Sequence, residues 1–486
     1  MSVDSPRTVA SPTLLDALIP IGFLMSSLVA ALHYFGADAS YGPSQIALLV
    51  TGCLALLIGM KNGESWRDLE RGVYDGMSVV FAPTFILLAV GIMIATWIAG
   101  GVVPALIYYG LKVLNPGIFY AAACFVCAIV SLSIGSSWTT AASVGVAMVG
   151  IAVGMGLSVE ITAGAVVSGA YFGDKMSPLS DTTNLAPAVV GVDLFDHVKH
   201  MFWTGAPALV FALIGFLFLG SQVEPSTQIV TLESTLRFLE QNFQIGWYLL
   251  MPLLVLFVLA YKRMPALPAI LIAALMGLLC AIWFQPRQWV GELPLPAALW
   301  QLTVNGYSAS TGDAVLDGLL SGGGAASMLN TVWLILCAVF FGGAMERTGL
   351  LQALIAGIVK RARSAAALIS ATVLTCIGTN IVSGDQYIAI VLPGRMYKLA
   401  FREAGLAPVN LSRALEDSAT VTSPLVPWNT CGAFMAASLG VATLDYLPYC
   451  LFNLVMPLIS IAYGIFNFRI LRLSDGEAAI AASTTL

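Results

Sequence analysis

The sequence predicts an all-α polytopic membrane protein made of two inverted-topology repeats, with re-entrant helical hairpins and discontinuous helices. Three observations lead to this prediction: the composition, the recurrence of long apolar segments, and motifs that follow one another in the same order in both halves. Of the 486 residues, 58% are hydrophobic and only 10% are charged, and the mean hydropathy is +0.89. Soluble domains are about one quarter charged, so this chain cannot cover a water-facing surface.

Apolar stretches long enough to cross about 30 Å of hydrocarbon recur along the whole chain. Several of them are conventional spans, whereas others are short or are interrupted by Gly, Pro and hydroxyl residues. The expected segments lie near residues 13–33, 42–60, 75–100, 117–134, 143–172, 200–220, 246–261, 265–284, 318–345, 365–382, 386–400 and 446–470.

Positive charges in the short loops predict the orientation, because Lys and Arg are enriched on the cytoplasmic side. Loop 61–72 carries Lys61, Arg67 and Arg71, whereas loop 34–41 carries none. Two spans separate the N-terminus from loop 61–72, so both should be cytoplasmic. By the same criterion, Lys262 and Arg263 and loop 346–364 should be cytoplasmic, and loops 222–245 and 285–317 should face outward.

These segments predict a simple domain organisation around a central linker. The expected parts are a cytoplasmic tail at 1–12, a first transmembrane repeat at 13–221, an outer linker with an interfacial helix at 222–245, a second transmembrane repeat at 246–470, and a cytoplasmic tail at 471–486.

The two halves carry matching motifs in the same order. Gly135, in I-G-S-S-W-T-T, stands as far before Asp174 as Gly378, in I-G-T-N-I-V-S, stands before Asp417. A polar stretch with proline follows each Asp, and the loops that correspond in the two halves have opposite charge bias. Chance similarity between apolar segments is the alternative. Inverted repeats whose broken helices meet near the midplane are the build of secondary transporters.

The polar stretch after Asp174 predicts a cation site in the first half. Asp174, Ser177 and Asp181 fall on one face of a helix before Pro178 disturbs it. Unwound backbone inside a membrane is tolerated only where protein buries it or a cavity adjoins it, and carboxylate, hydroxyl and carbonyl oxygens suit a hard cation. The alternative is a polar loop at the membrane surface. The expected cation- or proton-binding residues are Asp174, Ser177, Asp181, Thr182, Thr183 and Asn184, with Ser136, Ser137 and Thr139 at the hairpin tip near Gly135.

The second half offers the same chemistry in weaker form, because prolines break its polar stretch and amide and hydroxyl oxygens follow them. In this register Asp417 takes the place of Asp174, and the hairpin tip falls at Gly378. The expected residues of this half are Asn380, Ser383, Asp385, Asp417, Ser423, Asn429 and Thr430.

Asp385 has no counterpart in this register, and an unpaired carboxylate inside a membrane is a functional candidate by default. The alternatives for Asp385 are a salt bridge to Arg395 or a helix cap. In the first half, Lys175 could neutralise Asp174, which would leave Asp181 as the working acid. The Na⁺ ion is then expected to be bound by Asp181, Thr183, Asn184 and Asn429.

Other functional classes fit the sequence less well. No basic face suggests nucleic acid, and Cys124-x-x-Cys127 has no second pair or nearby His to complete a metal site. The stretch Ser383-Gly384-Asp385 lacks the G-x-G-D of an intramembrane aspartyl protease. We therefore expect no enzymatic activity and no cofactor. Broken helices that end in carboxylates favour a closed binding site over a channel.

The stretch G-D-K-M-S-P-L-S-D-T-T-N-L-A at 173–186 resembles the signature of the NhaC-type sodium/proton antiporter family, which is grouped with the ion-transporter superfamily. The stretch P-L-V-P-W-N-T-C-G at 424–432 resembles the second characteristic stretch of that family. The resemblance covers residues 10–470. The motif residues that it carries over are Asp174, Ser177, Asp181, Thr182, Thr183 and Asn184.

The resemblance implies exchange of Na⁺ or Li⁺ for H⁺ by alternating access, in a multi-pass protein of the prokaryotic plasma (inner) membrane. It also implies paired hairpins and an elevator-like motion in a homodimer. The family includes members similar to malate/lactate exchangers. The alternative function is therefore Na⁺- or H⁺-coupled exchange of a small organic anion or amino acid, with Arg395 or Lys175 holding the carboxylate.

Overall fold

The computed structural model is helical, as predicted for a polytopic membrane protein. Within the described residues no strand is present, and two isolated bridges are the only extended pairing. Nine helices of the described part are long and apolar enough to cross a membrane, or eleven if each sharply bent pair is one span. The structure describes residues 10–35, 39, 41–77, 80–113, 115–223, 236–262, 264–286, 290–309, 317 and 320–473.

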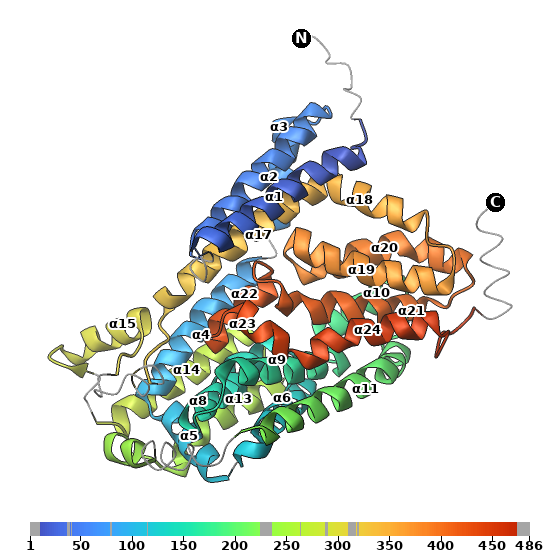
Figure 1. The fold of residues 1–486 in the computed structure, drawn as a ribbon. Coiled ribbons are helices and arrows are strands. Elements are labelled where there is room, and N and C mark those ends of the chain that lie inside the picture. Colours follow the sequence, from blue (N-terminus) through green and yellow to red (C-terminus); the bar gives the residue numbers. More distant parts are fainter. Residues whose placement is uncertain are drawn as a thin grey trace.

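The first half runs from blue to green in Figure 1 and contains two interruptions of its helical path. One lies between α6 and α7, and the other lies between α9 and α10. The elements are α1 (Leu14–Phe35), α2 (Pro43–Lys61), α3 (Trp66–Met77), α4 (Phe81–Ala99), α5 (Val102–Val113), α6 (Phe119–Ile134), α7 (Ser137–Thr140), the π-helical turn η4 (Ala141–Gly145), α8 (Val146–Gly154), α9 (Val159–Met176), α10 (Asp181–Val190) and α11 (Leu194–Ser221).

The second half runs from yellow-green to red and is interrupted between α19 and α20 and before α22. Its elements are α13 (Met251–Tyr261), α14 (Ala266–Trp283), α15 (Leu295–Asn305), α17 (Leu329–Arg347), α18 (Leu350–Val359), α19 (Ala365–Ser383), α20 (Gln386–Glu403), α21 (Pro408–Leu415), the π-helical turn η8 (Glu416–Thr420), the 3₁₀ helix η9 (Ser423–Leu425), α22 (Thr430–Leu439), α23 (Thr443–Tyr446) and α24 (Leu451–Ile465).

The two halves interleave instead of packing as separate blocks. Helix α2 of the first half packs on α17 of the second, while α14 of the second half packs on α4 of the first. Near the middle of the molecule α10 packs on α20, and α11 packs on α24. The interruptions of both halves therefore belong to one continuous interior.

The surface and the interior have the polarity expected in a membrane. Large apolar side chains are exposed along the outer helices, as at Phe211, Phe218 and Leu254. Charged side chains are instead found inside, where each is costly unless it is paired or functional. The buried charged residues of the interior lie on α9, α21 and η8 and at the N-cap of α20, and they are Asp174, Lys175, Asp385, Arg413, Glu416 and Asp417.

Two expectations about helix boundaries are wrong. Residues 143–172 do not form one segment, because Gly156 adopts a φ of +68° and the Ser158 side chain caps α9 by accepting a hydrogen bond from the backbone N–H of Ile161. The break expected at Gly378 is not there, because Gly378 lies inside α19. The helix ends at Gly384, where φ is +66°.

Parts of the predicted tails and linker lie outside the described residues. This holds for 1–9 of the N-terminal tail, 224–235 of the linker and 474–486 of the C-terminal tail. The interfacial helix expected at 222–245 is described only from Leu236 to Asn242, and it meets the following helix at an angle of 96°.

Candidate functional site

Two helix N-termini meet the end of α9 in the first half. After α6, Gly135 takes a φ of +78° and Ser136 caps α7 by accepting from the backbone N–H of Thr139 at 3.2 Å. After α9, the Ser180 hydroxyl caps α10 by accepting from the backbone N–H of Thr183 at 3.5 Å. A Ser cap after a glycine or proline turn is a common start of a helix. The sequence thus forms this junction from local signals.

Asp174 is the buried carboxylate of this junction. It lies in the last turn of α9 with 5% of its surface exposed, and its Oδ2 accepts from Ser137 twice, from the backbone N–H at 3.1 Å and from the hydroxyl at 2.6 Å. Its Oδ1 has no hydrogen-bond partner among the described residues. The Asp181 carboxylate lies close enough to repel it. A buried carboxylate that is only half satisfied needs a proton or a cation.

Thr183 and Ser177 satisfy backbone groups that the interruption of the helix leaves open. The Thr183 hydroxyl donates to the carbonyl oxygens of Lys175 at 2.9 Å and Asp174 at 3.2 Å. The Ser177 hydroxyl accepts from the backbone N–H of Leu179 at 3.3 Å. These hydroxyls hold the end of α9 in a fixed geometry around Asp174.

Thr182 and Asn184 complete the same junction on the α10 side. The Thr182 and Ser180 hydroxyls are 3.1 Å apart, and the Asn184 amide donates to the carbonyl oxygens of Ser180 at 2.6 Å and Pro178 at 2.9 Å. Asn184 therefore satisfies two carbonyls of the interruption itself, whereas the carbonyl of Asp174, which loses its helical partner at Pro178, accepts from the Thr183 hydroxyl.

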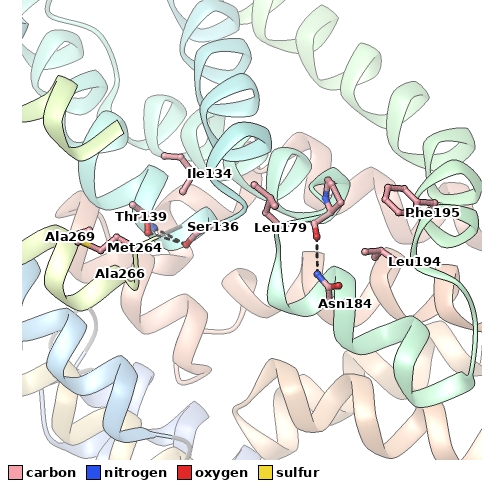
Figure 2. Close-up of a pocket in the computed structure, with 11 residues that line it drawn as sticks. Ile134, Ser136, Thr139, Leu179, Asn184, Leu194, Phe195, Met264, Ala266 and Ala269 are labelled. Carbon is pink, nitrogen blue, oxygen red and sulfur yellow. Dashed lines mark hydrogen bonds between the residues drawn. The ribbon is translucent and has the colours of Figure 1, made fainter. Parts of the chain in front are cut away.

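A cavity of about 610 Å³ opens beside this junction (Figure 2). Ser136, Thr139 and Asn184 supply its polar lining, and the asparagine points toward the Pro178 carbonyl. No charged side chain is among the described residues that line it. The other lining residues are Ile134, Pro178, Leu179, Leu194, Phe195, Met264, Ala266 and Ala269.

An amide pair forms the centre of the second half. The Asn380 amide donates to the carbonyl of Ala419 at 2.6 Å and to the Thr422 hydroxyl at 3.0 Å. The Asn429 amide donates to Oδ1 of Asn380 at 3.2 Å, while its own Oδ1 caps α22 by accepting from the N–H of Cys431 at 3.0 Å. Asn429 thus bonds to Asn380 in the second half. The other three expected Na⁺ ligands belong to the first-half junction, and they are Asp181, Thr183 and Asn184.

Asp385 caps α20. Its Oδ1 accepts from the backbone N–H groups of Tyr387 at 2.8 Å and Ile388 at 3.1 Å, and 3% of its surface is exposed. Of the two alternatives to a transport role, the cap is therefore present, and the structure records no ion pair between Asp385 and the exposed Arg395 within the described residues. The Thr430 hydroxyl lies beside the Asp385 carboxylate.

Ser383 and Ser423 border Asp385 and bond to nearby groups. The Ser383 hydroxyl donates to the carbonyl of Thr379 at 2.8 Å. The Ser423 hydroxyl donates to the carbonyl of Thr420 at 2.7 Å and approaches Oε1 of Gln386 at 3.3 Å. Both hydroxyls are fully buried, so they add polar atoms to the interior next to Asp385.

Tyr387 connects the two halves. Its hydroxyl donates a short hydrogen bond to Oδ2 of Asp181, and its backbone N–H is held by Asp385. Asp181 is exposed, in contrast to Asp174. Tyr387 was not singled out in the sequence. The only available signal was its position two residues after an intramembrane acid.

Asp417 is occupied by an ion pair. Its Oδ1 lies 2.5 Å from the Lys175 amino group and accepts from the Thr204 hydroxyl at 3.1 Å, while Oδ2 is 3.9 Å from Nε of Arg413. The expectation that Lys175 neutralises Asp174 is therefore replaced by a pair with Asp417. Glu416, the preceding residue, is fully buried and was also missed, although it adjoins Asp417, which the sequence had already placed in the site.

Comparisons with known proteins agree on one family. Residues 169–468 match the Na⁺/H⁺ antiporter family. The chain is 38% identical over 448 residues to the Na⁺/H⁺ antiporter NhaC of Alkalihalophilus pseudofirmus, which is 92% of this chain and 94% of the relative. It is 35% identical to NhaC of Bacillus subtilis, over 95% of this chain and 99% of the relative. The malate-2H⁺/Na⁺-lactate antiporter of Bacillus subtilis is 34% identical, over 94% of this chain and 96% of the relative.

Proposed function

Because this chain belongs to the Na⁺/H⁺ antiporter family, we propose that it exchanges Na⁺ for H⁺ across the plasma membrane and that Asp174 binds the two ions in turn. The observation that carries the proposal is the half-satisfied carboxylate of Asp174 at the junction of α7, α9 and α10. The family is one of transporters, which agrees with the absence of a catalytic motif in the sequence.

Competition for one carboxylate is sufficient for exchange. Asp174 is buried, so its negative charge must be neutralised by either a proton or a cation. Hydroxyl and carbonyl oxygens surround it through Ser137 and Thr183 and are ligands that a hard cation accepts. When Na⁺ occupies the site the proton must leave, and alternating access then carries the ions in opposite directions.

The exposed acid Asp181 has a separate part in this proposal. Its carboxylate is held by the Tyr387 hydroxyl and lies close enough to Asp174 to repel it. We assign it the first capture of Na⁺, with Asn184 in the adjoining cavity, before the ion reaches Asp174. The absence of Lys and Arg from the described lining of that cavity suits a cation.

The inverted repeat is part of the proposal, and the backbone supports it. The same interval along the chain separates elements of like shape, namely the left-handed glycines Gly135 and Gly384, the helix caps Ser180 and Asn429, and the left-handed glycines Gly191 and Gly440. The packing of α2 on α17 and of α14 on α4 is the exchanged pairing that a two-fold relation between the halves produces. This interval also makes Asp385 the counterpart of Ser136, because both cap the helix after the glycine.

Orientation and assembly follow as further parts of the proposal. The positive loop 61–72 favours a cytoplasmic N-terminus, and the linker at 222–245 then faces outward between repeats at 13–221 and 246–470. A homodimer is the expected assembly, which light scattering of the purified protein tests.

Exchange of an organic anion or amino acid is the weaker candidate, although one relative is named a malate-2H⁺/Na⁺-lactate antiporter and another, from Halobacterium salinarum, an arginine/ornithine antiporter. The two cations that could hold a carboxylate are engaged elsewhere or exposed. Lys175 is paired with Asp417, and Arg395 is exposed beside Glu346. The structure therefore favours inorganic cations.

Purified protein in liposomes with a trapped pH dye tests the proposal. A proton gradient is imposed, and NaCl, LiCl, KCl, malate or lactate is then added. We expect Na⁺ or Li⁺ to collapse the gradient in the wild type and in D445N, whose acid is exposed on α23, but not in D174N. A response that requires malate or lactate would instead establish a solute exchanger.

A further inference from the structure

The buried charges of the interior do not balance. Four acids, Asp174, Asp385, Glu416 and Asp417, face two cations, Lys175 and Arg413, among the described residues of the interior. A buried ionised carboxylate without a partner is strongly unfavourable, so two positive charges must be supplied from outside the protein. Na⁺ or H⁺ at Asp174 supplies only one of them.

Glu416 is the acid that no other group neutralises. It is fully buried in η8, and neither carboxylate oxygen has a hydrogen-bond partner among the described residues. The Thr420 hydroxyl lies beside it in the same π-helical turn, close enough to interact with the carboxylate but without the geometry of a full hydrogen bond. Asp385, by contrast, accepts two backbone N–H bonds at the start of α20, where a negative charge is stabilised.

The groups packed around η8 leave Glu416 without a counter-ion. On α9, the charges of Lys175 and Asp174 lie close enough to interact with the Glu416 carboxylate. The Lys175 amino group, however, is bound to Asp417. From α19, Cys376 faces it. The buried titratable groups on the other packed elements have other partners: His197 is bonded to Ser412, His200 lies near Arg413, Arg413 lies beside Asp417 and Tyr463, and Tyr397 is bonded to Thr375. Asp181, which is exposed, is bonded to Tyr387, and the α11 and α20 cations Lys199, Arg395 and Lys398 are exposed.

We infer that Glu416 is a second proton-binding carboxyl group of the transport cycle, distinct from Asp174. This inference rests on the proposed exchange of Na⁺ for H⁺. With a proton on both Asp174 and Glu416 the buried charges balance. When Na⁺ replaces the proton of Asp174, the O–H bond of that acid breaks. The O–H bond of Glu416 breaks in the same half-cycle, when alternating access brings water to η8 to stabilise the carboxylate. Two protons then leave for each Na⁺ bound, so the Na⁺-loaded form carries one more negative charge. The membrane potential then acts on the cycle, at about 2.3 kcal/mol per charge for every 100 mV.

Transport under an imposed potential tests this inference in the full-length protein. Proteoliposomes are loaded with a pH dye, and valinomycin with K⁺ gradients sets the potential. We expect Na⁺-driven proton flux of the wild type to change with potential. The E416Q variant, which has the shape of the protonated acid, keeps Na⁺-driven flux but loses its dependence on potential. The matched control E403Q alters an exposed acid at the end of α20 and keeps the wild-type response.

A binding measurement separates failure of this inference from failure of the proposed function. In detergent, Na⁺ added to the unbuffered wild type releases protons, and E416Q should release about one proton fewer for each Na⁺ bound. If the wild type neither binds Na⁺ nor moves protons, the proposed function is wrong. If it does both and E416Q matches it in proton release and in response to potential, Glu416 is not a proton carrier. If E416Q does not fold, E416D is the second variant, because it keeps the acid. We expect E416D to retain the dependence of proton flux on potential. Loss of that dependence in a folded E416D with intact Na⁺-driven flux would overturn the inference.

Discussion

The Lys175 amino group lies 2.5 Å from Oδ1 of Asp417, and both side chains are fully inaccessible to solvent. These two residues are 242 positions apart in the chain, on α9 of the first half and η8 of the second. The pair therefore joins the two interrupted regions at the centre of the molecule. The pair also engages the Lys175 amino group, which is then not free to bind an anionic substrate.

Breaking this pair should destabilise the protein strongly. K175M or D417N alone leaves one buried charge without its partner, and each is expected to lower the free energy of unfolding by about 3–5 kcal/mol. The double variant K175M/D417L should cost less than the two single changes together. Denaturation in detergent measures this. The control K61M removes a lysine whose side chain is 68% exposed in its pair with Asp16, and it should cost about 1 kcal/mol or less.

Removal of the Ser137 hydroxyl should weaken Na⁺ binding. S137A deletes the 2.6 Å donor to Asp174 but leaves the backbone N–H in place. A hydrogen bond to a charged group contributes about 1.5–3 kcal/mol, so the Na⁺ concentration for half-maximal exchange should rise about tenfold or more. Exchange assays in liposomes measure it. S133A alters an exposed serine on α6 that bonds only to its own helix, and an equal effect there would refute the assignment.

The Tyr387 hydroxyl should matter for capture of the ion at Asp181. Y387F removes its hydrogen bond to Asp181 without changing the backbone contact to Asp385. We expect the apparent affinity for Na⁺ to fall about tenfold, while the protein remains folded. Y74F removes a comparable hydrogen bond to Glu70 on the exposed face of α3 and should leave exchange unaltered. Wild-type kinetics in Y387F would exclude this role.

Gly135, at the break between α6 and α7, and Gly378, inside α19, should respond differently to alanine. In G135A a Cβ would lie 2.7 Å from Cβ of Leu179 and 2.9 Å from the backbone N of Ser180, at a φ of +78°. We expect a loss of at least about 1–2 kcal/mol in unfolding free energy, together with reduced exchange. G378A places its Cβ in open space within α19 and should stabilise the protein by up to about 1 kcal/mol.

A thermal unfolding series compares G135A, G378A and G384A. Gly384 has a φ of +66°, so alanine there should destabilise as it does at Gly135. If G378A were the damaging change and G384A the harmless one, the helix would end at Gly378, as the sequence pattern predicts, and not at Gly384.

Local patterns in the sequence determined the fold class and much of the first-half junction. The composition and the long apolar segments required a helical membrane protein, because backbone groups in hydrocarbon must bond within their own segment. Pro178 and the serine and threonine residues around it marked the interruption after α9, since proline ends a helix and hydroxyls cap the next one. Both signals act over a few residues and can be recognised without the rest of the chain.

The partners of the buried charges were decided only by tertiary structure. In the sequence Lys175 adjoins Asp174, yet its amino group binds Asp417, and Tyr387 reaches Asp181 across 206 positions. The helix α19 likewise continues past Gly378 to Gly384, and in this stretch the Asn380 amide donates to the carbonyl of Ala419 in the η8 turn. Such contacts arise from the way that the helices of one half pack between those of the other. Side-chain identity and spacing cannot specify them, because a buried charge can pair only with a group that the packing brings within reach, as Lys175 does and Glu416 does not.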